Sequence, residues 1–175
     1  MNRFKVTIDN LLTQDECDNL IKTGENSGFE LSSIRTGKGD VIREDIRNNS
    51  RVILDDKSFA NELFDKIKGN LPKEVDGWKL KGLNEQVKIY KYTEGQQFKM
   101  HRDAPYVRNE NERSFFTMMV YLNEGFEGGD TFFMDGSIIP KTGNCLIFWQ
   151  DQLHAGVEVT KGVKYAIRTD VMYEK

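Results

Sequence analysis

The spacing of apolar residues predicts two helices in the N-terminal half of the chain. The first begins after Thr13, because Thr13-Gln14-Asp15-Glu16 has the form of a capping box, and it ends near Gly24 or Gly28. The second covers residues 57–68, where Gly69 follows an apolar stripe with helical spacing. The stripe consists of Ala60, Leu63, Phe64 and Ile67.

Two other N-terminal segments have patterns that are not helical. Residues 3–8 indicate a short strand. Residues 35–50 are polar and charged, and with Gly37 and Gly39 they are expected to form a long flexible loop. No internal repeat, low-complexity tract or linker divides the sequence, so we expect one domain over residues 1–175.

From residue 86 onward, short β-prone runs alternate with turn signals. The runs include Val87 and Ile89 and the segments 115–122, 131–134, 145–149 and 163–171. Turn signals such as Asn123-Glu124-Gly125, Gly128-Gly129 and Asp135-Gly136 separate them. Many short strands at this spacing favour a β-sandwich or barrel over alternating β and α units. We therefore expect a mainly β, α+β protein, with helical support over residues 1–85 and an antiparallel β-core over residues 86–175.

The composition narrows the partners and the compartment. The 175 residues are 38% apolar and 30% charged, with a net charge of -3 and no block of like charge. Such a chain is not expected to bind nucleic acid or an anionic membrane. No apolar run approaches the roughly 20 residues that span a bilayer, and residues 1–7 lack the apolar stretch of a signal peptide. Cys17 and Cys145 could pair in principle, but two cysteines are not a disulfide framework, so a reduced, cytoplasmic protein is expected.

The two histidines of the chain both lie in the β-rich half. One belongs to His101-Arg102-Asp103, where positions i and i+2 of a strand face the same side and can reach one ion together. His154, from a distant strand, would complete a site of two imidazoles and one carboxylate. Such a site leaves positions open for oxygen and a co-substrate, as a non-haem iron(II) oxygenase requires, although the same donors suit zinc. A bare His-x-Asp is common, so the spacing alone leaves the metal site open.

Five segments in this half carry a resemblance to a known family. They are residues 92–103, which end in His-x-Asp; residues 117–123; residues 126–131, a Gly-Gly-Asp-Thr turn; residues 140–148; and residues 154–164. In this order and register they resemble the double-stranded β-helix (jelly-roll) core of the 2-oxoglutarate- and Fe(II)-dependent dioxygenases, in the prolyl 4-hydroxylase-like branch. Asp130 stands where that branch has glutamate in the turn.

The resemblance implies iron ligands and co-substrate contacts. The iron ligands would be His101, Asp103 and His154. Lys164, ten residues after His154, would pair with the distal carboxylate of 2-oxoglutarate, since a dianion inside a barrel needs a buried cation and hydroxyl donors. The hydroxyls would come from Tyr92, Tyr121 and Thr131. Tyr121 could equally be a core tyrosine, and Thr131 could reflect strand propensity after a turn.

Arg168 complicates the assignment of the co-substrate cation. It lies four residues after Lys164, so on a regular strand both side chains point inward. Arginine can bind a carboxylate with two parallel hydrogen bonds, so Arg168 is a second candidate for 2-oxoglutarate, for an acidic substrate group, or for an ion pair with Asp170. Further candidate substrate contacts are Arg51, Arg102 and Arg113.

The resemblance also implies an activity. With Fe(II), O2 and 2-oxoglutarate, and with ascorbate as a candidate reductant, the chain is expected to hydroxylate a substrate while releasing succinate and carbon dioxide. Asp103 favours hydroxylation or demethylation, because related halogenases leave the carboxylate position empty. The substrate would be a protein or peptide side chain, or alternatively a free amino acid or small metabolite. The segments 35–50 and 104–113 are candidate lids.

Three other interpretations account for part of the same pattern. A zinc hydrolase would use similar ligands but would not need Lys164 or the Gly-Gly-Asp-Thr turn. A cupin-type metal protein usually has three histidines and a glutamate, whereas this chain has two histidines. An inactive metal- or ligand-binding module on the same scaffold would usually have lost a ligand.

Overall fold

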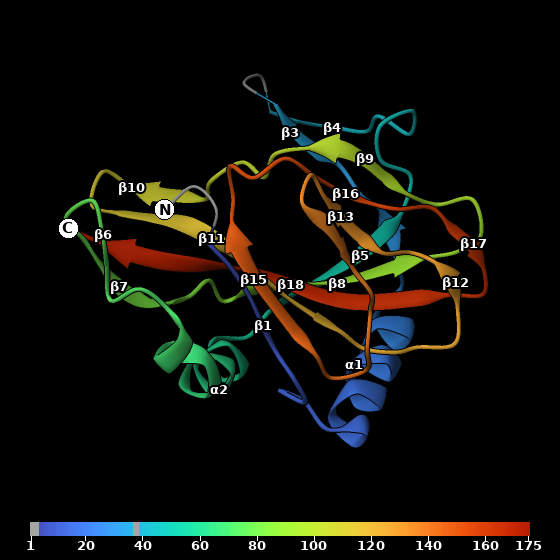
Figure 1. Cartoon of the computed structure of the whole chain (residues 1–175), viewed down its shortest axis with the longest axis horizontal. Helices are drawn as coiled ribbons and strands as arrows, with labels where there is room; N and C mark the ends of the chain where they lie inside the picture. Colours follow the sequence, from blue (N-terminus) through green and yellow to red (C-terminus); the bar gives the residue numbers. More distant parts are fainter. Residues whose placement is uncertain (1–3, 37–38) are drawn as a thin grey trace.

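The structure, a computed structural model, describes residues 4–36 and 39–175. Antiparallel strands dominate it, as predicted, and they form one large and one small sheet (Figure 1). Arg3, at the start of the predicted first strand, and Gly37, in the predicted loop, lie outside the described residues. The two sheets face each other with α-helices on the outer side of the large one, the layered arrangement of a double-stranded β-helix.

The large sheet has ten strands. Along its main path it runs β1 (Lys5–Ile8), β15 (Cys145–Trp149), β11 (Glu112–Tyr121), β18 (Lys164–Glu174), β8 (Gln86–Tyr92), β5 (Ser50–Asp55) and β2 (Glu30–Leu31). Three more strands attach beside this path: β10 (Val107–Asn109), β7 (Trp78–Leu83) and β6 (Glu74–Val75). The predicted runs from residue 86 onward that belong to this sheet are confirmed as β8, β11, β15 and β18.

The small sheet has four strands and two strand pairs flank it. Its order is β14 (Gly136–Ile138), β13 (Thr131–Phe133), β16 (His154–Gly156) and β9 (Phe98–His101). One flanking pair joins β12 (Glu127–Gly128) to β17 (Val159–Lys161), and the other joins β3 (Ile34–Thr36) to β4 (Gly39–Val41).

Both predicted helices are present. The first, α1 (Gln14–Ser27), has the complete capping box: Thr13 Oγ1 accepts from the Glu16 amide, and the Thr13 amide donates to the Glu16 carboxylate. It ends at Gly28, whose φ of 79° suits glycine, so Gly24 lies inside the helix. The second, α2 (Lys57–Ile67), buries its stripe as expected, but Gly69 then lies in a 3-10 turn, η1 (Lys68–Asn70), and not at the helix cap.

The N-terminal half contributes more strand than predicted. Strands β5 and β7 were missed, although Val52-Ile53-Leu54 is a short β-prone run and Trp78 and Leu80 alternate with lysines, and they join the large sheet through β8 and β18. The expectation of a flexible loop over residues 35–50 is also wrong in part. Strands β3 and β4 pair within it, and Arg47 and Asn49 near its end are buried.

The strands of the large sheet separate an apolar core from a polar interior. The core lies between this sheet and the helices, where Cys17, Leu63 and Ile67 pack with Val87, Ile89 and Ile167. Cys17 and Cys145 are both buried free thiols. On the other face, the alternate residues of β18, which are Lys164, Ala166, Arg168 and Asp170, line a cavity between the two sheets. The two-residue period of a strand therefore sends successive residues into the core and into the cavity.

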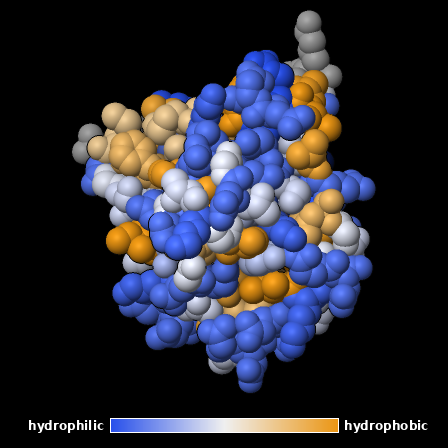
Figure 2. All heavy atoms as spheres, turned by 90° about the vertical axis from the view of Figure 1, so that its right-hand side faces the viewer, coloured by the Kyte–Doolittle hydropathy of each residue, from blue (hydrophilic) through white to orange (hydrophobic). Residues whose placement is uncertain are grey.

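The surface shows no continuous apolar face in the view of Figure 2. Hydrophilic side chains cover most of this side, and the hydrophobic ones gather in separate groups. Within residues 4–36 and 39–175, neither helix has the length and hydrophobicity that crossing a lipid bilayer requires.

Gly143 ties the start of α1 to the turn that leads into β15. Its φ is 77°, and a Cβ built there would overlap the backbone carbonyl of Leu12, whose amide in turn donates to the Gly143 carbonyl. We expect Gly143→Ala to lower the free energy of unfolding by roughly 2 kcal/mol or more, from left-handed strain and steric overlap. Urea denaturation measures this. Gly69→Ala is the control, because nothing lies within 4 Å of its added Cβ, and an equal loss in both variants would contradict the prediction.

Candidate functional site

The cavity between the sheets is the place where the predicted site residues meet. Its volume is about 370 Å³, and it is lined by residues of both sheets. Seven of the eight predicted site residues line it: His101, Asp103, His154, Tyr92, Thr131, Lys164 and Arg168. The eighth, Tyr121, is buried behind Thr131, where the two hydroxyl groups are 2.7 Å apart.

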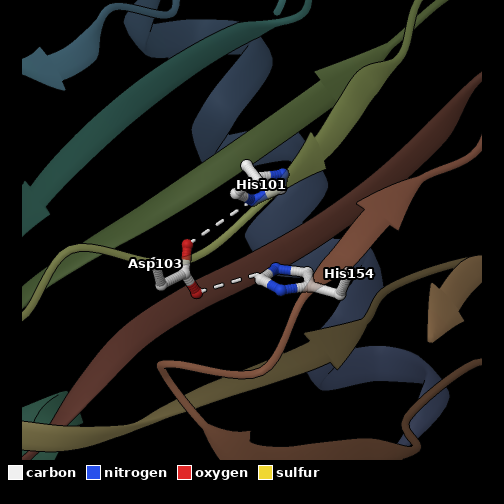
Figure 3. Close-up of side chains that lie close together, drawn as sticks. All are labelled: His101, Asp103 and His154. Atoms are coloured by element: carbon white, nitrogen blue, oxygen red, sulfur yellow. Dashed lines mark ion pairs between the residues drawn. The ribbon is translucent and has the colours of Figure 1, made fainter. Parts of the chain in front are cut away.

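Strand register brings the two histidines together. His101 ends β9 and His154 begins β16, and the two are direct cross-strand partners. Asp103 follows β9, and its amide donates to the Gln150 carbonyl. All three side chains point toward one another (Figure 3), with His101 Nε2 3.6 Å from Asp103 Oδ1 and His154 Nε2 3.8 Å from Asp103 Oδ2. Their donor atoms lie within 4.8 Å of each other, close enough to share one ion.

The second nitrogen of each imidazole fixes which nitrogen is free for a metal. His101 Nδ1 is 2.7 Å from the Lys99 carbonyl oxygen, and His154 Nδ1 is 2.9 Å from the Gln152 carbonyl oxygen. A carbonyl only accepts, so each Nδ1 carries the proton and donates it. In the neutral form of each ring, Nε2 then carries the lone pair and faces the carboxylate, which is the tautomer and orientation that metal ligation needs.

Asp103 is held ionised at the centre of the group. Burial alone would raise the pKa of Asp103, but the charge of Arg168 and the adjacent imidazoles keep it well below its usual value. Arg168 Nη2 is 3.2 Å from Asp103 Oδ2, and the Thr117 hydroxyl donates to the same oxygen over 2.5 Å. Burial also lowers the pKa of His154. At neutral pH the site therefore offers a carboxylate and a neutral His154, the protonation states that bind a cation.

Lys164 forms a second centre in the same cavity. It is only 3% exposed, and its Nζ donates to the Gly129 carbonyl oxygen over 2.5 Å. Within the described part of the chain, no carboxylate lies within ion-pair distance of it. The rings of Tyr92 and Tyr121 flank it at 5.3 and 5.5 Å. Burial lowers the pKa of Lys164 to about 8, although nearby Asp130 opposes the shift.

Arg168 forms the ion pair with Asp170, which was one of the roles considered for it. It forms ion pairs with Asp103 and, at 3.1 Å, with Asp170 Oδ1, and Lys88 lies 3.7 Å from the other oxygen of Asp170. Its charge is thus already balanced by two carboxylates.

Of the three other candidate arginines, two line the cavity and one does not. Arg51 and Arg102 line the cavity, although Arg102 is largely exposed beside Asp151. Arg113 does not line it, and its guanidinium lies 5.0 Å from the Phe115 ring centre on the far part of β11. Segment 104–113 contributes Ala104 and Tyr106 to the lining.

Sequence reasoning missed several polar residues of the cavity, among them Tyr90, Lys88 and Arg47. Tyr90 and Lys88 share the inward face of β8 with Tyr92, and the two-residue period could have found them. Burial raises the pKa of Tyr90, but Arg47, Arg168 and Lys88 bring it down to about 8. No pattern in the sequence marked Arg47 as a buried residue, because it belongs to the segment 35–50 that was predicted to form a loop.

Comparison with known proteins agrees with the site. Residues 87–169 match the model of the 2OG-Fe(II) oxygenase superfamily. A probable prolyl 4-hydroxylase 8 of Arabidopsis thaliana is 25% identical over 90% of this chain and 64% of its own length. Prolyl 4-hydroxylase 1 of the same plant is 23% identical over 92% of this chain and 66% of its own length. The chain thus spans about two thirds of the length of these relatives.

Solved structures share the fold over nearly the whole chain. A viral collagen prolyl hydroxylase from Paramecium Bursaria Chlorella virus-1, in complex with 2OG, has a TM-score of 0.68 at 24% identity, over 98% of this chain and 97% of that one. A prolyl hydroxylase from Trichoplax adhaerens, in complex with a hypoxia inducible factor peptide fragment, has a TM-score of 0.72 at 18% identity, over 97% and 83%.

These likenesses concern the 2OG-Fe(II) oxygenase superfamily and, within it, the prolyl 4-hydroxylases. Residues 87–169, within the β-rich half, are similar to the core of the 2OG-Fe(II) oxygenase superfamily. The relatives named prolyl 4-hydroxylases are similar in sequence over about nine tenths of this chain, and the solved prolyl hydroxylases share its double-stranded β-helix fold, which is the fold predicted. Two imidazoles and one carboxylate on one side of an open cavity are the donor set that iron(II) takes in such oxygenases.

The metal site can be tested without turnover. Asp103→Asn keeps the shape of the side chain but removes the charge between the two imidazoles, so we expect manganese(II) affinity to fall by about 100-fold or more. Titration calorimetry measures it. Asp151→Asn, an exposed carboxylate close by in sequence, is the control and should bind manganese(II) like the wild type. Unchanged affinity in Asp103→Asn would show that the cation binds elsewhere.

Proposed function

We propose that this protein is a 2-oxoglutarate- and Fe(II)-dependent dioxygenase that hydroxylates a peptide or protein side chain, with proline as the first candidate. The observation that carries the proposal is the arrangement of one cavity. The three metal-ligating side chains and a buried lysine without a carboxylate partner among the described residues open onto the same space.

Iron(II) would be held by His101 Nε2, His154 Nε2 and Asp103. When bound there with 2-oxoglutarate and O2, it supplies the oxidative chemistry that yields succinate, carbon dioxide and a hydroxylated substrate. The chain fixes the geometry of its ligands. The carbonyls of Lys99 and Gln152 orient the imidazoles, and Thr117 and Arg168 hold the carboxylate.

Lys164 is the better candidate for the distal carboxylate of 2-oxoglutarate. The charge of Arg168 is already neutralised by Asp103 and Asp170, so an ion pair between Arg168 and a further anion would gain less free energy. Lys164 has no such partner among the described residues and lies beside the linked hydroxyls of Tyr121 and Thr131. A dianion there would meet one buried cation together with nearby hydroxyl groups, which offsets its desolvation.

The substrate class rests on the relatives. Those with similar sequences are named prolyl 4-hydroxylases, and one structural neighbour was solved with a bound peptide fragment. We therefore place a peptidyl side chain ahead of a free metabolite. We also propose that residues 1–175 act as one dioxygenase unit, since β1, β5 and β7 complete the sheet that carries Lys164.

Co-substrate turnover tests the activity. With Fe(II), 2-oxoglutarate and ascorbate as reductant, proline-containing peptides should stimulate succinate formation and gain one oxygen atom by mass spectrometry. Asp103→Ala should reduce succinate formation at least about 100-fold, because the metal site loses its charge, while Asp151→Asn should not. Absence of 2-oxoglutarate-dependent succinate in the wild type, or hydrolysis of substrate with zinc instead, would refute the proposal.

The pH dependence of 2-oxoglutarate binding tests Lys164. Its pKa of about 8 in the free protein should rise when a dianion binds beside it. Below pH 8 the lysine is charged in both states and affinity should be flat. Above pH 8 binding must take up a proton, so affinity should fall, by up to about tenfold per pH unit. Calorimetry on the manganese-loaded protein measures this.

Two Lys164 variants provide the comparison. Lys164→Met should weaken 2-oxoglutarate binding at neutral pH by about tenfold or more and make the fall above pH 8 shallower, leaving the part due to Tyr90, whose pKa is also about 8. Lys164→Arg keeps a cation and should retain more affinity, also with the shallower fall. A pH profile in Lys164→Met that matches the wild type would assign the anion to another residue.

A further inference from the structure

Arg47 is a buried cation that the iron and 2-oxoglutarate sites do not use. It is only 6% exposed and lines the cavity. Its Nε donates to Asn49 Oδ1 over 2.7 Å, but its Nη2 is buried without a hydrogen-bond partner. No carboxylate among residues 4–36 and 39–175 lies within ion-pair distance of it. Burying a guanidinium donor unmatched costs free energy, so Arg47 would be stabilised by an acceptor that a ligand brings into the cavity it lines.

The surroundings of Arg47 keep it rigidly beside the metal ligands. Its guanidinium carbon lies 4.5 Å from the ring centres of both Tyr90 and Phe98, and the Phe98 ring stacks on His101 at 3.4 Å. The backbone around it pairs with β9, since the Lys99 amide donates to the Ile46 carbonyl oxygen. Arg47 is thus positioned by the same strand that ends in His101, and its side chain is preorganised.

Arg51 adds a second positive charge to the wall of the cavity. It lies on β5 directly opposite Tyr90 of β8, the residue whose ring packs on Arg47. Its Nη2 donates to the Ser33 hydroxyl over 2.8 Å, and among the described residues no carboxylate pairs with it. Arg47 and Arg51 therefore leave two positive charges on one side of the cavity.

The charge of the whole lining points to an anionic ligand beyond the co-substrate. Apart from Arg102, whose partner Asp151 lies outside the lining, the cationic side chains of the lining are Arg47, Arg51, Lys88, Lys164 and Arg168, whereas the carboxylates are Asp40, Asp103 and Asp170. Iron(II) and a 2-oxoglutarate dianion would cancel each other, so the excess of cations would remain. It contrasts with the net charge of -3 for the chain, which means that positive charge is concentrated at the site.

We propose that Arg47 and Arg51 form a carboxylate-binding subsite and that the hydroxylated peptide carries a carboxylate close to its reacting residue. The inference rests on the proposed function and narrows its substrate to acidic peptides. Arginine suits this role because its planar donors match the two oxygens of a carboxylate. The carboxylate can come from an adjacent aspartate or glutamate side chain or from the C-terminus of the peptide.

Peptide binding without turnover tests the subsite. The protein is loaded with manganese(II) and 2-oxoglutarate, and fluorescent peptide pools with one fixed proline are titrated by anisotropy. Two amidated pools carry glutamate or its neutral isostere glutamine beside the proline. Two further pools end in proline, with a free or an amidated C-terminus. One acidic pool should bind the wild type about tenfold or more tightly than its neutral partner, and which one identifies the source of the carboxylate.

Variants assign that preference to the two arginines. Arg47→Gln and Arg51→Gln should each reduce the acidic preference severalfold, whereas Arg43→Gln, an exposed arginine paired with Asp45 outside the cavity lining, should keep it. Circular dichroism shows whether Arg47→Gln is folded. The wild-type comparison of glutamate with glutamine stands without any variant, and Arg51→Gln provides a second one at a less buried position.

Three results would overturn the subsite. They are equal binding or no binding of acidic and neutral pools by the wild type, an undiminished preference in both variants, and loss of 2-oxoglutarate binding in Arg47→Gln, which would put Arg47 in the co-substrate site. The proposed function fails by a different measurement, namely absence of succinate from the iron-loaded wild type. The two failures are therefore separate.

Discussion

The site depends on the two-sided character of β18. Its outward residues, such as Ile167, pack in the helix-covered core, and this packing fixes the strand so that Lys164, Arg168 and Asp170 face the interior of the β-helix. A slip of one residue in its pairing with β8 or β11 would exchange the two sets, sending charges into the core. The large cost of burying an unpaired charge makes this register hard to change. The register of β18 therefore determines both the packing of the core and the placement of the cavity cations.

The buried charges beneath the metal ligands form a connected network. Ser114 donates to Gln150, Gln150 donates to Asp170, and Asp170 pairs with Arg168, which reaches Asp103. Breaking a buried pair leaves an uncompensated charge, whereas a complete network keeps each group in one orientation. Asp103 is therefore oriented by residues of β11 and β18 as well as by β9, the strand that it follows. Rigid ligands on rigid strands are what a metal centre requires.

Sequence reasoning reached the fold class and most of the candidate site, for identifiable physical reasons. Turn glycines and β-prone runs marked β11, β15 and β18, and the resemblance placed His101, Asp103, His154 and Lys164 in order. It did not find β5 or β7, which are short and carry few apolar residues, although Trp78 and Leu80 of β7 alternate with lysines as in a half-buried strand. Arg47 was out of reach, because its burial results from pairing with β9, some fifty residues later in the chain. Local polarity indicated a loop, and tertiary contacts override it.

The pairing of β1 with β15 has a consequence for biosynthesis. Lys5 lies opposite Phe148, and Ile8 opposite Cys145, so the edge of the large sheet is closed by segments from distant parts of the chain. A ribosome adding roughly 5–20 residues per second needs on the order of ten seconds or more to make the intervening segment. During that interval the β1 segment has no partner strand. Closure of this edge, where Phe148 lines the cavity, must therefore be a late event in the maturation of each molecule.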